Sequence, residues 1–479
     1  MAIVDLFTKQ LKVINAGIPG FKDTLDAVRT PSVHLSWKPP ADVSAESLNR
    51  VRGAAEAIAA ANREAIARLF AAKPVLVGLK RAREIIPGMT EDTILHAGPP
   101  IEWERMCGPM RGAIVGALLY EGRAADAESA EALAASGRIR YAPCHEHATV
   151  GPMAGIVSPS MPVFIIRNDA GSNLAFTTMN EGLGKVLRYG AFGPDVIERL
   201  RWMEAVLYPV LRKAVESLGA IDLKGIIAQA LHMGDEVHNR NRAATSLLYR
   251  ALAPAVIRTA SKPDDAAAAL EFINRNDHFF LNLSMASCKA TLDPLEGIPN
   301  CSIVTVMARN GTDFGIRVSG TGPAWFTGPA DIPDALYFAG FSKADANPDI
   351  GDSAITETGG LGGFAIAAAP AIVQFVGGHA GDALRYTTDM YEITAGENPA
   401  FQIPSMDFRG APSGIDLVKV IRKNLTPFID TGVAHRNPGV GQIGAGVLSA
   451  PIMPFIRAFE SFSKTLAQPE SSFQRGMRT

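Results

Sequence analysis

The pattern of apolar and polar positions changes along the chain, and its first third alternates between two periods. Short apolar runs at 12–17, 32–37, 74–79 and 93–96 predict strands, whereas helix-like segments occupy 21–28, 44–72, 103–120 and the stretch that ends at Ser136. Strands that alternate with helices are typical of an open α/β layer. We therefore expect an N-terminal α/β domain over residues 1–140, in which the run 74–79 is a buried parallel strand.

The middle of the chain combines strand-like runs with a long helical stretch. Strands are predicted at 155–157, 162–166 and 174–179, and again at 279–283, 302–306 and 313–317. Between them, amphipathic segments at 196–215, 222–233 and 235–257 predict helices. We expect a central α/β domain formed by residues 141–192 and 262–400, with a helical insert at 193–261.

The C-terminal part is expected to be an α/β segment, residues 401–479, packed on the central domain. A helix is predicted at 416–422 and a strand at 427–430. The glycine run 359–363 precedes apolar residues and is expected to open a helix. The predicted fold class is therefore α/β in the wider sense, an α+β multidomain protein. The sequence Gly439–Gly444 matches Gly-x-Gly-x-x-Gly, but no strand runs directly into it, so we reject a dinucleotide site there.

Composition narrows the class of protein. The 479 residues include 46 Lys and Arg against 48 Asp and Glu, a net charge of −2, so a sequence-blind nucleic-acid binder is not expected. The longest apolar run, 364–376, contains Pro370 and Gln374 and is too short for a membrane span. Four cysteines do not form a disulfide framework. We expect a cytoplasmic protein with no membrane association, and an enzyme is the leading class.

Two histidines in the segment 143–147 form the first candidate site. If the segment is extended, His145 and His147 lie on one face, which suits metal ligation, polarisation of a carbonyl or the holding of an anion. Cys144 would be a nucleophile only with a lowered pKa. The alternative is a solvated loop. Because no third ligand stands out, we predict no metal site and no cofactor, and keep His145 and His147 as the alternative metal ligands.

The segment 234–242 is the second candidate, because polar residues crowd into an otherwise apolar helical region. On a helix, Asp235, His238 and Arg242 share one face, and Glu236 and Arg240 share another. The alternative is a solvated face with salt bridges between residues four apart. Asparagines are poor helix formers, which weakens that alternative. We therefore predict one wall of a polar cleft, to which Asn239 and Asn241 contribute amides.

Further polar residues follow apolar strands or glycines. The segment Asn180–Lys185, which includes Glu181, could bring backbone N–H groups and the Lys185 charge to an anion, or could be a simple strand-to-helix corner. Polar groups at strand ends are typical of ligand sites in α/β proteins, although each alone is as well explained by a rim contact or a cap. The candidates of this kind are Asn282, Ser284, Arg309 and Asn310, with His435 beside the last glycine-rich loop.

Several longer motifs occur in a fixed order: 143–147, 150–155, 180–188, 233–241 and 280–285, followed by 357–378 and 415–446. With these motifs the whole chain resembles the bacterial YlbE/YahG-like family. That family includes a subunit of oxamate carbamoyltransferase, the allantoin-pathway enzyme that splits oxalurate with phosphate into oxamate and carbamoyl phosphate. The resemblance implies α/β domains with a small inserted helical domain, a homo-oligomer, and a partner subunit similar to succinyl-CoA synthetase.

A carbamoyl transfer would assign roles to the candidate residues. Anions need cations and arginine forks, the carbonyl oxygen needs donors, and an amide nitrogen needs help with its proton. Our hypothesis gives anion binding to Lys185, Arg240 and Arg242. Catalysis would fall to His145, His147 and His238, with Asp235 and Glu236 orienting the basic groups. The remaining substrate contacts would come from Asn180, Glu181, Asn239, Asn282, Ser284, Arg309, Asn310 and His435.

Two other functions compete with this one. The first is an amidohydrolase or lyase that acts on a small amide through a metal ion or Cys144. The second is a non-catalytic subunit that binds a metabolite and organises a partner. Bound zinc would favour the hydrolase.

Overall fold

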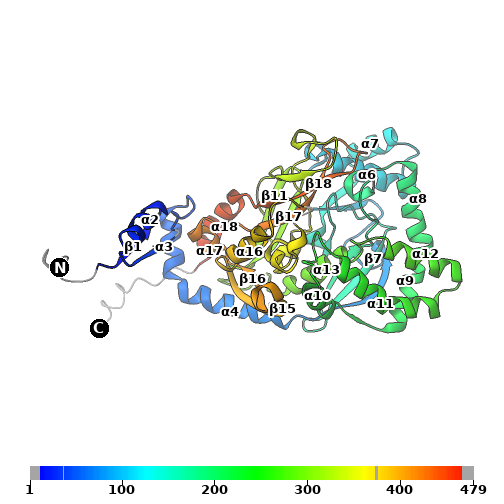
Figure 1. Ribbon diagram of the computed structural model, residues 1–479. Coiled ribbons are helices and arrows are strands. Elements are labelled where there is room, and N and C mark those ends of the chain that lie inside the picture. The colour runs from blue at the N-terminus through cyan, green and yellow to red at the C-terminus, as the bar shows by residue number, and fades with distance from the viewer. Residues whose placement is uncertain (1–10, 36, 373–375, 467–479) are drawn as a thin grey trace, which may run out of the picture.

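The structure is a computed structural model that describes residues 11–35, 37–372 and 376–466, and it has a mixed α/β architecture, as expected. Its first unit projects from the main body (Figure 1). This unit is a β-α-β motif of β1 (Val13–Ala16), α2 (Gly20–Ala27) and β2 (Ser32–Leu35), with β1 parallel to β2, so the predicted start is confirmed. None of the α2 residues is buried. Large apolar side chains stay exposed on the unit: Ile14, Ile18, Phe21, Val28, Val33, Leu35 and Trp37.

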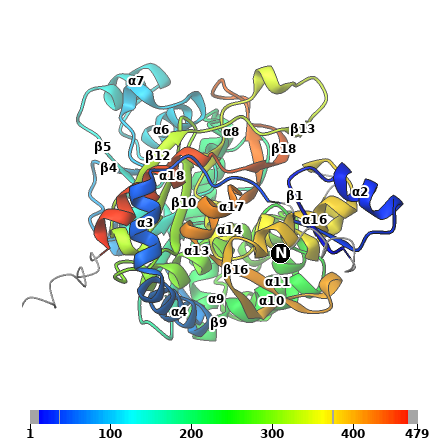
Figure 2. The ribbon, with the colours of Figure 1, turned by 90° about the vertical axis from the view of Figure 1, so that its left-hand side faces the viewer.

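Two helices take the place of the single one predicted over 44–72, and they lie against the body (Figure 2). They are α3 (Ala45–Gly53) and α4 (Ala55–Ala71), separated at Ala54. The Ser44 side chain accepts a hydrogen bond from the Ser47 N–H at 3.2 Å and so caps the N-terminus of α3. Ser44 Oγ also donates to Glu460 of the last helix, α18 (Ile452–Thr465), and this ties the two ends of the described chain together.

The largest sheet crosses the boundary expected at residue 140. Its strand order is β6-β8-β7-β3-β9, where β3 (Pro74–Arg81) pairs antiparallel with both β7 (Pro162–Asn168) and β9 (Ile221–Asp222). The prediction of a strand at 74–79 is therefore confirmed, but the prediction that it is parallel is wrong. A buried apolar run looks the same in either direction, because burial on both faces, and not strand polarity, sets its composition. The four-part domain division stays a prediction.

The other strands of the described residues form five small sheets. The strands predicted at 302–306 and 313–317 correspond to β10 and β11, which pair antiparallel. The bounds of the remaining strands are β4 (Thr93–His96) and β5 (Arg140–Pro143), which pair in parallel, β6 (Thr149–Val150), β8 (Leu174–Thr178), β10 (Val304–Asn310), β11 (Asp313–Val318), β12 (Phe326–Pro329), β13 (Ala335–Tyr337), β14 (Ile350–Gly351), β15 (Thr394–Ile403), β16 (Arg409–Ile415), β17 (Phe428–Ala434) and β18 (Gln442–Ser449).

The remaining regular elements are helices. They include α5 (Ala82–Ile85), α6 (Gly108–Tyr120), α7 (Ala127–Ala135), α8 (Pro194–Trp202), the π-helical turn Met203–Leu207, α9 (Tyr208–Leu218), α10 (Leu223–His232), α11 (Arg242–Thr259), α12 (Pro263–Asn274), α13 (Leu281–Leu292), α14 (Ile355–Thr358), α16 (Ala380–Tyr391) and α17 (Leu417–Lys423). Among the described residues, no helix has both the length and the apolar composition to cross a bilayer.

Two predicted elements have a different structure. The run 279–283 was expected to be a strand, but α13 begins at Leu281, and nearly all its residues are buried. A helix buried on all sides has no amphipathic period, so a short apolar run cannot be assigned from the pattern. The glycine run 359–363 opens no long helix. It leads into short 3₁₀ turns such as Gly362–Phe364, because Gly360 and Gly362 have positive φ angles of 89° and 55°.

Candidate functional site

The segment between α10 and α11 is an irregular loop, not the helix predicted from Asp235 onward. Val237 takes a left-handed conformation with φ 57°, and α11 begins only at Arg242. The Glu236 carboxylate accepts hydrogen bonds from the N–H of His238, at 2.6 Å, and from that of Arg240. Asp235 accepts one from Ala244 N–H at 2.9 Å. Acidic side chains thus satisfy the backbone in place of helical bonds, and the predicted helix faces do not exist.

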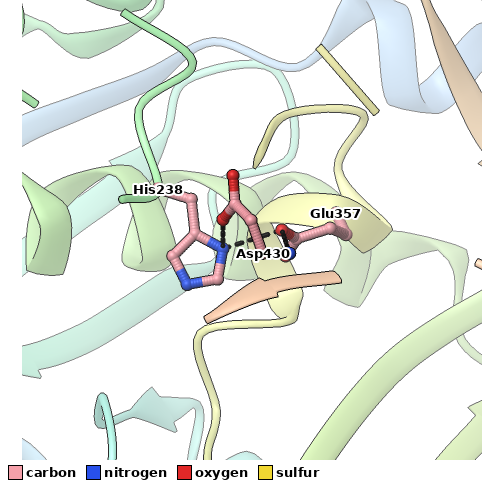
Figure 3. Close-up of side chains that lie close together, drawn as sticks. All are labelled: His238, Glu357 and Asp430. Atoms are coloured by element: carbon pink, nitrogen blue, oxygen red, sulfur yellow. Dashed lines mark hydrogen bonds and ion pairs between the residues drawn. The ribbon is translucent and has the colours of Figure 1, made fainter. Parts of the chain in front are cut away.

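The loop places His238 between two carboxylates that are distant in sequence (Figure 3). Its Nδ1 lies 2.7 Å from Oε1 of Glu357, on α14, and 2.9 Å from Oδ1 of Asp430, on β17. The three side chains are 3%, 0% and 0% exposed. Together with Glu236 they form what we call the His238 cluster. Two carboxylates therefore face the buried imidazole, and a third, that of Glu236, binds the backbone N–H of His238.

The glycine run 359–363 supports the side chain of Glu357. Gly363 N–H donates to Oε1 at 3.0 Å, and the hydroxyl of Thr356 donates to Oε2 at the same distance. A Cβ on Gly362 would collide with Oε1 of Glu357, and the positive φ of Gly362 also favours glycine. The glycines of this segment let the backbone approach and fix one carboxylate.

Burial and mutual charge shift the ionisation of the cluster. Burial lowers the pKa of His238, but the Glu357 and Asp430 carboxylates raise it by more, so it lies well above its ordinary value. Burial, together with the charge of Asp430, raises the pKa of Glu236. Burial also raises the pKa of Asp430, whose carboxylate is contacted by the ring of His238 but receives no backbone N–H from the described residues. A positive charge at His238 is thus strongly favoured.

Polar side chains connect α13 to the loop after β8 and to the loop that carries His238. Asn180 Nδ2 donates to the carbonyl of His278 at 2.7 Å and to Oδ1 of Asn282 at 3.2 Å. Ser284 Oγ donates to the carbonyl of Val237 at 2.7 Å. The structure thus brings the predicted residues Asn180, Asn282 and Ser284 to the same region as His238, where they bind protein groups and hold the loops.

A pocket lies beside this network. Its polar lining comes from Glu181, Arg188 and Asn282, and apolar side chains such as Met179 and Leu200 complete it. Arg188 donates from Nε and Nη2 to the carbonyl of Gly182, at 3.1 and 2.6 Å, and its backbone N–H donates to Glu181 Oε1 at 2.7 Å. Arg188 is a buried cation at a pocket. The sequence analysis missed its role, although it ends the motif 180–188.

The predicted cations are placed differently. Arg240 lies at the edge of the cluster, with Nε 2.9 Å from the carbonyl of Gly234 and 3.5 Å from Asp235 Oδ1. Beside it, Asn239 Nδ2 is buried without a hydrogen-bond partner among the described residues. Arg242 and Lys185 are surface residues, with side chains 72% and 54% exposed.

His145 and His147 do not share a face, because residues Cys144–His147 form a 3₁₀ turn, not an extended segment. His147 Nδ1 lies 2.6 Å from the carbonyl of Pro87. His145 Nε2 lies 3.4 Å from Asp352 Oδ1, and the carboxylate of Asp352 accepts N–H groups of Gly98 and Gly151 at 2.8 and 3.0 Å. The two rings therefore contact different partners.

The other three candidate residues bind protein groups and so support the fold. Arg309 is fully buried, with Nε 2.7 Å from Asp349 Oδ2 and Nη2 3.0 Å from the hydroxyl of Thr431. Asn310 Nδ2 donates to the carbonyl of Pro99 at 3.0 Å, and Asn310 Oδ1 accepts two N–H groups of the β10–β11 turn. His435 Nδ1 accepts the Asn437 N–H at 2.9 Å.

Sequence reasoning missed Asp352 and Asp430 and gave Glu357 no role. The sequence nevertheless contains a signal for Asp430 and another for the segment that holds Asp352 and Glu357. Asp430 interrupts an apolar strand, and three acidic residues fall within 349–357, just before the glycines. A carboxylate inside an apolar run requires a buried partner. Nothing in the sequence identifies that partner, because His238 is separated from Glu357 by 119 positions.

Fold and site together define a mixed α/β protein with a buried histidine–carboxylate centre. A family model described as oxamate carbamoyltransferase subunit AllG matches residues 139–353. The chain is 47% identical to the uncharacterized protein YahG of Escherichia coli K12 over 95% of its own length and 97% of that protein. It is equally identical to the oxamate carbamoyltransferase subunit AllG of the same organism, over 85% of this chain and 98% of AllG.

A solved structure supports the same relationship. The crystal structure of a conserved protein of unknown function from Enterococcus faecalis V583 superposes with a TM-score of 0.85 and 49% identity, over 86% of this chain and 99% of that one. The chain therefore belongs to the YahG-like family that includes AllG. The resemblance inferred from the motifs is confirmed.

Proposed function

We propose that the chain is a subunit of a carbamoyltransferase that acts on a small ureido or amide substrate, as in the conversion of oxalurate and phosphate to oxamate and carbamoyl phosphate. The observation that carries this proposal is the 47% identity to AllG over 98% of that protein. The identity to YahG is the same, so the choice of substrate within the family rests on the site.

The chemistry of the reaction fits the polar groups described above. A phosphate oxygen attacks the carbamoyl carbon, the bond from this carbon to the oxamate nitrogen breaks, and that nitrogen takes up a proton. Both anions require cations, for which Arg188 at the pocket and Arg240 at the edge of the cluster are the best-placed arginines. Negative charge on the carbonyl oxygen needs a positive group, and His238 supplies one.

The remaining predicted residues take supporting roles in this proposal. Glu236 and Asp235 fix the loop that carries His238 and Arg240. The amides of Asn180, Asn239 and Asn282 lie close to the same loop or to the pocket, and Nδ2 of Asn239 has no acceptor among the described residues. Lys185, Arg242, Arg309, Asn310 and His435 are assigned no substrate contact, because they are surface residues or are held by other protein groups.

A second candidate is a non-catalytic subunit that binds a metabolite. Complete burial of the His238 cluster and the internal hydrogen bonds of Asn180 and Asn282 favour it. A hydrolase with Cys144 as nucleophile is less well supported. Burial and the charge of Asp352 raise the pKa of the Cys144 thiol well above its ordinary value, which opposes a thiolate.

The partner chains that we propose are inferred from the family. AllG is named as a subunit, which supports a complex with other chains. We propose a homo-oligomer that also binds a succinyl-CoA-synthetase-like subunit in the cytoplasm. The exposed apolar side chains of the β1-α2-β2 unit are the most conspicuous surface for such a contact.

Thermal unfolding with candidate ligands tests the proposed function. The purified chain is heated with phosphate, carbamoyl phosphate, oxamate or oxalurate, since a ligand at 100 times its dissociation constant stabilises by about 2.7 kcal/mol. We expect a shift with carbamoyl phosphate or oxamate that Arg188→Ala or Arg240→Ala abolishes. Lys185→Ala, a surface cation, is the matched control and should keep the shift. Shifts that survive both arginine substitutions would overturn the assignment.

A further inference from the structure

The His238 cluster presents three metal-ligating atoms to one another. The Nδ1 of His238 and one carboxylate oxygen each of Glu357 and Asp430 all lie within 4.8 Å of one another. We propose that these three side chains bind a divalent transition-metal ion of the Mn²⁺ or Zn²⁺ type. This inference goes beyond the proposed function and does not depend on it, because metal binding is measured without turnover.

The separations between the ligand atoms fit a common metal ion. Two neighbouring ligand atoms that are each about 2.1 Å from a metal ion are about 3.0 Å apart in an octahedral site and about 3.4 Å apart in a tetrahedral one. The corresponding separations are 2.7 Å from His238 Nδ1 to Glu357 Oε1 and 2.9 Å from the same nitrogen to Asp430 Oδ1 (Figure 3). A metal ion would replace the proton on Nδ1 and keep a positive charge at the same point.

The acidic groups of the cluster outnumber its basic groups. Glu236, Glu357 and Asp430 bring three buried carboxyl groups, and His238 is the basic side chain that contacts two of them. Buried charges are costly unless they are paired or bind a metal. No other cation contacts these carboxylate groups among the described residues, since Arg240 pairs with Asp235 and Arg309 with Asp349. A divalent ion would supply the missing charge.

The hydrogen bonding of Asp430 is an independent observation that points to a ligand. Its carboxylate is 0% exposed, and His238 Nδ1 lies 2.9 Å from Oδ1, but no backbone N–H among the described residues donates to either oxygen. A buried carboxylate that lacks hydrogen-bond donors is costly unless a cation binds it. By contrast, Glu236 and Glu357 are oriented by backbone N–H donors. Glu236 thus acts as a positioning residue that shapes the loop, whereas Oδ2 of Asp430 has no partner among the described residues and is available to an ion.

The donor set indicates which ions to test. One imidazole and two carboxylates suit Mn²⁺, Zn²⁺ and similar ions better than Ca²⁺, which prefers six or more oxygen ligands. Such an ion is a Lewis acid for carbonyl or phosphoryl oxygens. His145 and His147 form no comparable set, because their rings contact Asp352 and Pro87 respectively.

The experiment measures the metal content and affinity of the full chain. Protein stripped with EDTA is titrated with Mn²⁺ and Zn²⁺, with Ca²⁺ as the oxygen-selective control, and bound metal is counted by mass spectrometry. We expect one ion per chain. Substitution of a residue that merely orients a ligand already costs 10–100-fold in affinity, so Asp430→Asn and Glu357→Gln should each cost at least about 100-fold.

Asp352→Asn is the matched control, because Asp352 is a buried carboxylate of the same segment that lies outside the cluster. It should keep the affinity of the wild type. A chain that binds neither Mn²⁺ nor Zn²⁺ stoichiometrically would overturn the proposal, as would Asp430→Asn and Glu357→Gln chains that bind as tightly as the control.

A second measurement uses the unaltered chain, so it tests the proposal even if the variants fail to fold. Pulsed electron paramagnetic resonance of bound Mn²⁺ detects directly coordinated imidazole nitrogen. We expect the signal of a single histidine. A Mn²⁺ signal without imidazole coupling would place the ion elsewhere and contradict the assignment to His238.

Discussion

Nδ1 of His238 lies 2.7 Å from Oε1 of Glu357, although 119 positions separate the two residues in the chain. The contact joins the loop between α10 and α11 to the segment 349–363. That segment carries three buried acidic residues, and each has a different partner: Asp349 binds Arg309, Asp352 faces His145, and Glu357 faces His238. One stretch of fifteen residues thus organises the buried charges of the protein.

The Arg309–Asp349 pair is expected to stabilise the fold, not to bind substrate. Arg309→Met would leave Asp349 buried and uncompensated, which should cost about 3–5 kcal/mol of unfolding free energy. Urea unfolding measures this loss. Arg105→Met, which breaks an exposed pair with Asp313, is the control and should cost at most about 1 kcal/mol. Equal effects of the two substitutions would contradict the structural role.

Asp352 should make stability fall as the pH rises. Burial raises the pKa of this carboxyl from 3.8 to about 7, so between these values the folded chain holds a proton that the unfolded chain has lost. The stabilisation is complete below about pH 4 and is lost as the pH rises through 7, by at most about 4 kcal/mol. The groups facing Asp352 are Cys144, His145, Lys289 and Arg309.

Urea unfolding at pH 5 and pH 8 tests this expectation. The wild type should lose more stability between the two values than Asp352→Asn, which cannot titrate. The difference between the chains isolates Asp352, because Asp235, whose pKa is also raised by burial, to about 6, titrates in both. An identical pH dependence in the two chains would show that Asp352 is ionised throughout.

Cys144 should be chemically inert in the folded protein. Its side chain is 0% exposed, its Sγ donates to the carbonyl of Gly155 at 3.3 Å, and its thiol pKa is raised, chiefly by burial. We expect iodoacetamide to leave Cys144 unmodified in the native chain and to modify it in urea, as read by peptide mass spectrometry. Rapid alkylation of the native chain would instead support the alternative function, a hydrolase in which Cys144 is the nucleophile.

The β1-α2-β2 unit should be dispensable for the stability of the body. Because no α2 residue is buried and large apolar side chains stay exposed, a chain that begins at residue 40 should change its melting temperature by less than about 2 °C. Light scattering of both chains tests whether the unit mediates association. If it does, the shorter chain forms assemblies with fewer subunits than the full chain. A large fall in melting temperature would mean that the unit packs on the body.

Local patterns were sufficient where a signal is contained in neighbouring residues. The β-α-β start and the strands β10 and β11 follow from short apolar runs and the residues that bound them, which act over a few positions. The long motifs also identified the family. The same patterns failed for α13, whose complete burial removes any period, and for the direction of β3, which depends on strands that follow about 90 residues later.

For the site, the sequence by itself determined which residue types are available, including the dense polar segment 234–242 and the glycines after Glu357. Only the tertiary structure decided which of them meet. It set His238 against Glu357 and Asp430, placed Arg188 at a pocket, left Lys185 and Arg242 on the surface, and gave Arg309 to Asp349. The physical reason is that a buried charge is satisfied by whatever partner the fold brings within about 3 Å, and sequence spacing carries no information about that partner.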